Sequence, residues 1–218
     1  MTDLLKFITF EGGEGAGKST QARLLADWLR GAGHEVVLTR EPGGSPGAER
    51  IRTLILTADP QPEQRFDGLT EALLHAAARR DHCLKVVMPA LDRGAFVISD
   101  RFSDSTIAYQ GFGLGVPLET LTRLHDLAVP RCIRPSTTFL LELSPEDGLA
   151  RARHRTSTSG PAIDRYEAEE LEFHQRIGVG FNAIAEAEPN RVQRIDAGRC
   201  VDEAEESIRS IIRFRYQP

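Results

Sequence analysis

The stretch GGEGAGKST, residues Gly12 to Thr20, decides the fold, because it fits the pattern G-x-x-x-x-G-K-[ST] of a phosphate-binding loop. Glycines in such a loop let backbone N–H groups converge on the anionic oxygens of a nucleotide, and the helix that opens near Gly17 points its positive dipole end at them. In this pattern Lys18 reaches the β- and γ-phosphates, and Ser19 supplies a hydroxyl for Mg²⁺. The residues expected to bind ATP are Gly12, Gly13, Glu14, Gly15, Ala16, Gly17, Lys18, Ser19 and Thr20.

The sequence on both sides of the loop supplies the context that the motif requires. KFITF, residues 6–10, is an apolar run before it, and ARLLADWL, residues 22–29, has helical spacing after it. A phosphate-binding loop needs a strand, a loop and a helix in that order. A chance match in a glycine-containing turn is the alternative, but it has to reproduce this context as well, so we predict nucleotide binding.

Short β-rich runs alternate with helical patterns along the chain, which is typical of a parallel sheet covered by helices. We therefore predict a three-layer α/β fold of the P-loop NTPase type, with about five parallel strands, as a single domain over residues 1–218. The expected strands are 4–10, 35–39, 95–99, 137–143 and 191–195. The expected helices are 18–30, 69–91, 117–129, 145–155, 166–187 and 201–214. Residues 40–46 and 156–163 interrupt the regular pattern and are candidate mobile segments.

Composition narrows the class of protein. The 218 residues are 40% hydrophobic, as is ordinary for a globular protein, and their formal net charge of −5 argues against nucleic acid as the main ligand. No apolar stretch approaches the roughly 18 residues needed to span a bilayer. Three scattered cysteines are typical of reduced thiols, so we expect a soluble, cytoplasmic protein without a nucleic-acid or membrane partner. The histidines do not pair with Cys or Glu at metal-ligand spacing, which argues against a structural zinc site.

Charged residues follow the ends of two predicted strands, where ligands of open α/β sheets bind. The run FVISD ends in Asp100, the arrangement by which many phosphate-loop proteins hold Mg²⁺ beside the motif serine. Arg101 comes next and suits a bidentate contact with an anion, although a buried salt bridge with Asp100 is an alternative that can coexist with it. Arg40 and Glu41 end the second strand, before glycines that permit close backbone approach.

Two later segments carry different weight. GFGLG, residues 111–115, resembles a dinucleotide-binding fingerprint, but it does not open a helix after a strand, so we expect a flexible loop without a cofactor role. Arg151, Arg153, Arg155 and Arg165 bracket a Ser/Thr/Gly-rich stretch. They predict a positively charged lid over about residues 150–166 that can close on a γ-phosphate, with a solvated helix face as the alternative.

Three motifs together resemble bacterial thymidylate kinases over nearly the whole chain: EGGEGAGKST (11–20), TREPGG (39–44) and DRFSDSTIAYQG (100–111). Their order and spacing, with an arginine-rich lid after the fourth strand, distinguish this family from adenylate and cytidylate kinases. The resemblance implies an enzyme that uses ATP and Mg²⁺ to phosphorylate dTMP to dTDP by in-line transfer, without a covalent enzyme intermediate. It also implies a homodimer.

The resemblance implies a role for each matching residue. Glu14 approaches the sugar 3′-hydroxyl of dTMP, Arg101 grips its phosphate, and Tyr109 crowds C2′, which would disfavour a ribose hydroxyl. A core aromatic is the alternative for Tyr109. The remaining substrate-binding residues are Arg40 and Glu41 around the phosphate, and His75, Arg79, Ser105, Thr106 and Gln110 around the base, where Arg79 meets the thymine carbonyl. The catalytic residues are Lys18, Arg101, Arg153 and Arg155, and the metal-binding residues are Ser19 and Asp100.

Two positions depart from the usual family pattern. His75 stands where the family generally carries a phenylalanine that stacks on thymine. An imidazole can still stack on a base. Its smaller apolar face and its capacity for protonation weaken the expectation of tight thymine binding and leave room for a different base preference. Ala16 stands where some members carry a loop arginine, so here the lid has to supply that cation. Two alternatives stay open: a kinase for another nucleoside monophosphate or deoxynucleoside, and a phosphate-loop switch or binding module that phosphorylates no metabolite.

Overall fold

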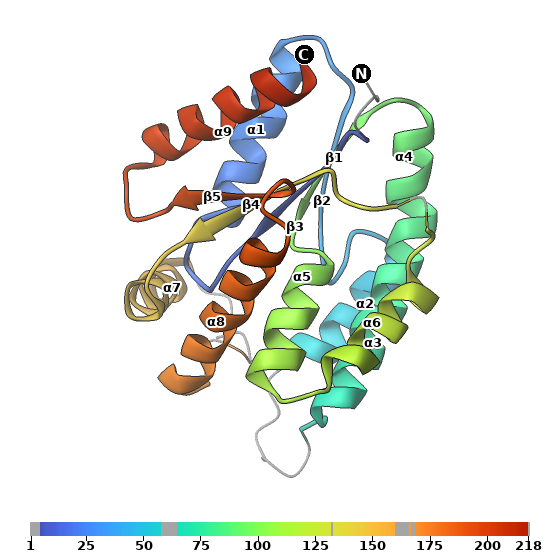
Figure 1. Ribbon diagram of the computed structural model, residues 1–218, viewed down its shortest axis with the longest axis vertical. Helices are drawn as coiled ribbons and strands as arrows, with labels where there is room; N and C mark the ends of the chain where they lie inside the picture. Colours follow the sequence, from blue (N-terminus) through green and yellow to red (C-terminus); the bar gives the residue numbers. More distant parts are fainter. Residues whose placement is uncertain (1–4, 58–64, 132, 160–165, 167–168, 218) are drawn as a thin grey trace.

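A five-stranded parallel sheet forms the centre of the molecule, in the strand order β2-β3-β1-β4-β5 (Figure 1). The computed structural model describes residues 5–57, 65–131, 133–159, 166 and 169–217, with the backbone alone for residues 155–159. The strands are β1 (Phe7–Glu11), β2 (Val36–Arg40), β3 (Phe96–Asp100), β4 (Thr137–Glu142) and β5 (Val192–Asp196). Because β1 lies between β3 and β4, the strand order reverses there, which is where open α/β sheets bind ligands.

Helices cover both faces of the sheet, so the central strands read as continuous apolar runs rather than alternating ones (Figure 1). Ile8 and Phe10 of β1 pack on the face that α1 and α9 cover. Phe7 packs on the opposite face, edge-on against Phe102 at 5.0 Å between ring centroids. Leu140 of β4 lies in a third hydrophobic cluster, to which α8 and the π-helical turn Ile107–Gly113 contribute most of the other side chains. The helical segments are α1 (Lys18–Gly31), α2 (Pro46–Leu56), α3 (Gly68–His82), the π-helical turn Cys83–Val87, α4 (Met88–Asp92), α5 (Ser103–Thr106), the π-helical turn Ile107–Gly113, α6 (Leu118–Ala128), α7 (Pro145–Ser159), α8 (Leu171–Ala187) and α9 (Val201–Tyr216).

The predicted fold class is confirmed, and the main differences lie in four helical segments. Residues 46–56, which we did not predict as helical, form α2: Ser45 caps the helix by accepting a hydrogen bond from the Ala48 N–H, and Pro46 opens it. The expectation of a flexible loop at 111–115 is wrong for its first part, because residues 107–113 continue α5 as a buried π-helical turn. Residues 156–159 extend α7, and α8 begins at Leu171 rather than at Tyr166. Residues 160–165 of the predicted lid lie outside the described residues, as do the side chains of residues 155–159.

In the part of the chain that the structure describes, no helix combines the length and the apolar character needed to cross a bilayer.

Candidate functional site

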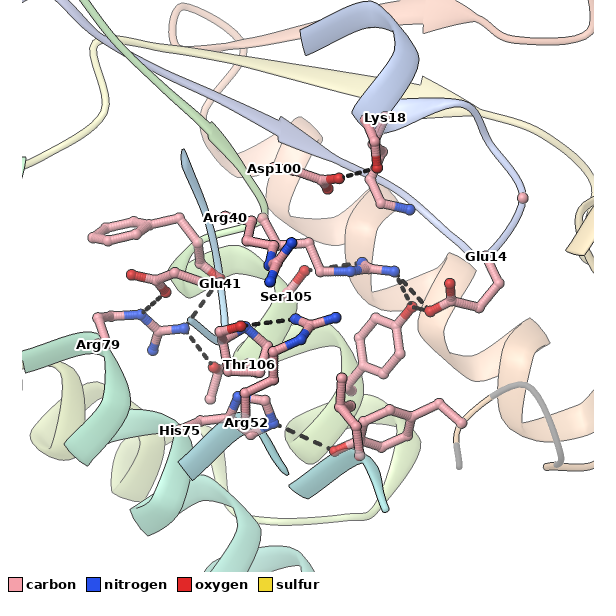
Figure 2. A pocket seen from close by; sticks show the side chains of 18 of the residues that line it. Glu14, Lys18, Arg40, Glu41, Arg52, His75, Arg79, Asp100, Ser105 and Thr106 are labelled. Atoms are coloured by element: carbon pink, nitrogen blue, oxygen red, sulfur yellow. Dashed lines mark hydrogen bonds and ion pairs between the residues drawn. The ribbon is translucent and has the colours of Figure 1, made fainter. Parts of the chain in front are cut away.

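A cavity of about 470 Å³ opens at the carboxyl ends of β1, β2 and β3 (Figure 2). The phosphate-binding loop and the start of α1 form one side of it, and residues from α3, α5 and the turn after α5 form the other. The strand ends contribute charged groups from both sides. Most residues that the sequence nominated line this cavity: Glu14, Gly15, Gly17, Lys18, Ser19, Thr20, Arg40, Glu41, His75, Arg79, Asp100, Arg101, Ser105, Thr106, Tyr109 and Gln110.

The phosphate-binding loop has the backbone conformation that its glycines permit. Gly12, Gly15 and Gly17 have φ values of 135°, 68° and 88°, in the region that disfavours residues with a Cβ. A Cβ on Gly12 would also lie 2.5 Å from the carbonyl oxygen of Leu141 on β4. The loop therefore leaves its amides and the N-terminus of α1 available for an anion.

Lys18 lies folded over this loop and is almost completely buried. Its Nζ donates a hydrogen bond to the carbonyl oxygen of Gly13 at 2.6 Å. Burial, together with repulsion from Arg101, outweighs the nearby carboxylates and lowers the pKa of Lys18 to about 8. A bound anion would therefore stabilise the charged form of Lys18 further.

Ser19 and Asp100 form the pair expected at a magnesium site. The Ser19 hydroxyl donates a hydrogen bond to Oδ2 of Asp100, so the two oxygens already lie side by side on the cavity wall. Mg²⁺ prefers oxygen ligands and usually takes only one or two carboxylates from the protein, with phosphate oxygens and water completing its coordination. The donor set fits that cation, and the described residues contain no denser group of three acidic, His or Cys side chains that would compete.

Arg101 sits at the centre of the polar groups of the cavity. Its Nη2 donates to Glu14 at 2.7 Å and to the Tyr109 hydroxyl at 2.9 Å, while Nη1 donates to the Gly12 carbonyl oxygen at 2.9 Å and to Ser105 at 3.1 Å. Its ion pair is with Glu14, not with the adjacent Asp100 that the sequence offered as an alternative. The residue has φ 71°, an uncommon and strained conformation for a non-glycine residue.

Glu14 is held as a carboxylate by this arrangement. Burial raises its pKa, but Arg101, Lys18 and a 2.6 Å hydrogen bond from Tyr109 together outweigh burial and lower the pKa to about 2. The same contacts explain why Tyr109, which the sequence left between a substrate-binding and a core role, is buried and still lines the cavity. Tyr109 also packs its ring against the Arg101 guanidinium at 4.9 Å.

Arg79 is fixed from three sides by buried partners. Its Nε donates to Glu41 at 2.7 Å, and its Nη2 donates to the Phe102 carbonyl oxygen at 3.2 Å and to Thr106 at 3.0 Å. His82 contacts the other oxygen of Glu41 at 2.8 Å. Arg79 outweighs burial and keeps the pKa of Glu41 low, so Glu41 serves as the anchor of Arg79 and His82. Arg40, by contrast, is half exposed and pairs with Glu49.

The far end of the cavity is lined by His75, Gln110 and Tyr166. His75 Nε2 lies 3.3 Å from the Tyr166 hydroxyl (Figure 2). Gln110 Nε2 donates a hydrogen bond to the same hydroxyl at 3.0 Å. Behind them, the buried Glu71 of α3 accepts a 2.8 Å hydrogen bond from Tyr166 and a 3.3 Å one from Gln110. The Tyr109 and Tyr166 rings meet edge to face, 5.3 Å between centroids.

The helix that leads into the predicted lid packs directly on the phosphate-binding loop. A Cβ on Gly148 of α7 would lie 2.3 Å from the Glu14 carbonyl oxygen, and a Cβ on Gly15 would lie 2.0 Å from the Gly148 carbonyl oxygen. Arg151 donates to the Ala197 carbonyl oxygen at 3.0 Å, and Arg153 is exposed. Arg153 does not line the cavity, and the side chains of Arg155 and Arg165 lie outside the described residues.

Several residues of the site were missed by the sequence analysis. Arg52 and Tyr166 line the cavity, and Glu71 and His82 support it from behind. Glu11 accepts from the Phe102 N–H at 2.7 Å and from Ser105 at 2.6 Å, and burial, with repulsion from Asp104, raises its pKa to about 8. One signal in the sequence could have found some of them. Glu71, Arg79 and His82 are polar residues at positions of α3 that the helical periodicity places on its buried face.

A phosphate-binding loop at the switch point of a parallel sheet, a serine–carboxylate pair beside it and a second cationic group in the same cavity define a phosphotransferase of the P-loop class.

Comparison with known proteins specifies the family. The thymidylate kinase family model matches residues 10–208. The thymidylate kinase of Gluconobacter oxydans is 52% identical over 194 residues, 88% of this chain and 87% of that protein. That of Gloeobacter violaceus is 47% identical over 206 residues, 94% of this chain and 93% of that protein. A crystal structure of thymidylate kinase from Ehrlichia chaffeensis superposes with a TM-score of 0.72 at 33% identity, covering 94% of this chain and 97% of that one. The chain belongs to the thymidylate kinase family, as its motifs indicated.

The pKa of Lys18 predicts how ATP affinity depends on pH. Since the lowered pKa is about 8, Lys18 is charged below that pH and neutral above it, and bound phosphates favour the charged form. The Kd for MgATP should rise as the pH increases from 7.5 to 9.5, approaching tenfold per pH unit above 8. Isothermal titration at several pH values measures this. Lys18→Arg, which stays charged throughout, is the control with a flat profile; a wild-type profile equally flat would contradict the assignment.

The close approach of α7 to the loop predicts that Gly148→Ala impairs ATP binding. The added Cβ would press on the Glu14 carbonyl oxygen, so either the loop or α7 has to shift. We expect the Kd for MgATP to rise at least about tenfold, since small misplacements of binding groups are costly. Gly178→Ala in α8 is the matched control, because its Cβ would meet no atom within 4 Å, and it should change Kd by less than about twofold. Equal affinities in the two variants would refute the packing argument.

Proposed function

We propose that this protein transfers the γ-phosphoryl group of ATP to dTMP, giving dTDP and ADP. The observation that carries the proposal is that the phosphate-binding loop and Arg101 face one cavity, with Arg101 paired to Glu14 of that loop. One anionic group can bind the loop amides while a second meets the guanidinium, which suits transfer between two phosphates. The family membership supports the same reaction.

The ATP half of the site uses the loop amides, Lys18, Ser19 and Asp100. Ser19 and Asp100 would hold Mg²⁺, which when bound neutralises charge on the β- and γ-phosphates. Lys18 exchanges its hydrogen bond with the Gly13 carbonyl for a phosphate oxygen, so its charge is used where negative charge develops. Arg153 and Arg155, carried by α7, are proposed to reach the transferred phosphoryl group when the lid closes and excludes water.

The acceptor half is proposed to bind dTMP with its phosphate on Arg101. Glu14 would then accept from the sugar 3′-hydroxyl, and the buried Tyr109 ring would exclude a 2′-hydroxyl. Arg40 and the loop of Glu41 border the phosphate, and Ser105 and Thr106 lie near the base. Nη1 of Arg79 donates no hydrogen bond to any residue that the structure describes, which leaves it available for a base carbonyl.

The chemistry requires positioning rather than a nucleophile from the protein. A phosphate monoester oxygen is already nucleophilic near neutral pH, so the acceptor phosphate can attack in line and ADP leaves on the opposite side. No general base is assigned, and Asp100 organises the metal site through its hydrogen bond with Ser19. We also propose a cytoplasmic location, with no nucleic-acid or membrane partner.

Exposed leucines on two packed helices support a homodimer. Leu69 and Leu73 of α3 and Leu118 and Leu127 of α6 are all exposed, with Leu127 at 76%. Nine residues put Leu118 and Leu127 on opposite sides of α6, so a second copy of the chain packed across α3 and α6 would cover Leu69 and Leu73 with one of these two.

A dimer formed through α3 and α6 should dissociate when charge is placed on this face. Leu73→Glu combined with Leu127→Glu should give a monomer by light scattering after size exclusion, while the wild type elutes as a dimer. Leu54→Glu, a change at a similarly exposed leucine of α2, is the control and should leave the dimer intact. A wild-type monomer, or a dimer that survives the double substitution, would contradict this assignment.

Turnover of a panel of acceptors tests the function. ADP release with ATP, Mg²⁺ and dTMP should exceed that with dCMP, dGMP or AMP by at least about 100-fold in kcat/KM, because buried polar groups of the base pocket would be left unpaired by the wrong base. Equal or better turnover of a purine nucleotide would favour a kinase of another nucleotide. Slow hydrolysis indifferent to dTMP would favour a switch or binding module.

A further inference from the structure

Glu71 is a buried carboxyl group with no role in the reaction proposed above. It is 0% exposed, on α3, behind the far end of the nucleotide cavity. Its Oε2 accepts hydrogen bonds from Tyr166 and from Gln110, two residues that line the cavity. Placing a carboxyl group in this position costs desolvation that an apolar residue would avoid, so a reason beyond packing is needed.

The hydrogen-bond polarity of the group follows from the chemistry of its members. A carboxylate only accepts, so the single hydroxyl hydrogen of Tyr166 goes to Glu71. The hydroxyl oxygen then accepts from Gln110 Nε2, which also faces Glu71. For the same reason the His75 Nε2 that contacts this hydroxyl has to carry a hydrogen.

These contacts orient the Gln110 side chain. Because a carboxylate and a hydroxyl that has already spent its hydrogen both require a donor, the amide nitrogen points toward Glu71 and Tyr166. The amide oxygen points elsewhere, and none of the described residues donates a hydrogen bond to it. Gln110 therefore offers an acceptor to a bound base, and Arg79, held by Glu41, offers a donor through Nη1.

We propose that Glu71 is a positioning residue that sets base specificity by fixing the Gln110 amide with its oxygen toward the base. The resulting acceptor and donor match the N3–H and a carbonyl of a 2,4-dioxopyrimidine such as thymine or uracil. Cytosine presents the opposite pattern, an acceptor at N3 and an amino donor at C4, and meets like groups at both positions. The inference rests on the proposed binding of dTMP in this cavity.

Glu71→Gln tests this with little change in volume. A glutamine at 71 can donate as well as accept, so the Gln110 amide can turn over and offer its nitrogen to the base. We expect the ratio of kcat/KM for dTMP to that for dCMP to fall at least about tenfold, the size typical of one buried mispaired group. A merely structural role would lower turnover of both nucleotides alike, and an unchanged ratio would overturn the proposal.

A second variant guards against misfolding at Glu71. Gln110→Met keeps the side-chain length and removes the amide, so it should lower the same ratio about as much. In that background Glu71→Gln should have no further effect on the ratio, because its proposed influence passes through the amide. A further fall in the double variant, or an unchanged ratio in Gln110→Met, would refute the mechanism. If the wild type does not turn over dTMP at all, the proposed function fails instead, independently of Glu71.

Discussion

The ion pair between Arg101 and Glu14 ties the two halves of the site together. One partner follows β3 and the other lies in the phosphate-binding loop after β1, and both side chains are about 15% exposed, at 15% and 16%. Arg101 also donates to the Gly12 carbonyl and to the Tyr109 hydroxyl. The guanidinium that would bind one nucleotide therefore also holds the loop that would bind the other.

Such a pair is poorly explained by stability alone. Buried ion pairs roughly balance desolvation against attraction, although removing one partner typically costs about 3–5 kcal/mol. Glu41 with Arg79 and His82 repeats the pattern on the neighbouring strand, and Glu71 with Gln110 and Tyr166 repeats it at the far end of the cavity. In each case a carboxylate fixes a side chain that lines the cavity. The cavity is thus lined by groups whose donors and acceptors are set before a ligand arrives.

Much of the fold and the front of the site were predictable from sequence. The glycine motif and the alternation of apolar runs gave the parallel sheet, and strand-end residues such as Asp100 and Arg101 were placed in the cavity. The helix at 46–56 was missed although Ser45 and Pro46 are strong start signals, because the preceding Gly-Pro-rich stretch reads as a loop. The GFGLG segment was misread because its glycines suggest turns, whereas tertiary packing against α8 makes residues 107–113 helical.

The supporting residues were not predictable in the same way. Glu71 and His82 lie on a helix whose sequence does not say which face meets the cavity, and Tyr166 reaches it from a segment expected to be helical. Their partners are 39 to 95 residues away along the chain, so local pattern carries no record of the contact. Family resemblance pointed to many of the residues that line the cavity, but not to Arg52, Tyr166 or the groups behind them.

The contact between Gly15 and Gly148 has a consequence for how this protein can change. Two main chains touch there without intervening side chains. A shift of the phosphate-binding loop at Gly15 would therefore push directly on the backbone of α7. A lid transplanted from a relative would bring its arginines to the right place only if the incoming segment also carried a residue without a Cβ at that point.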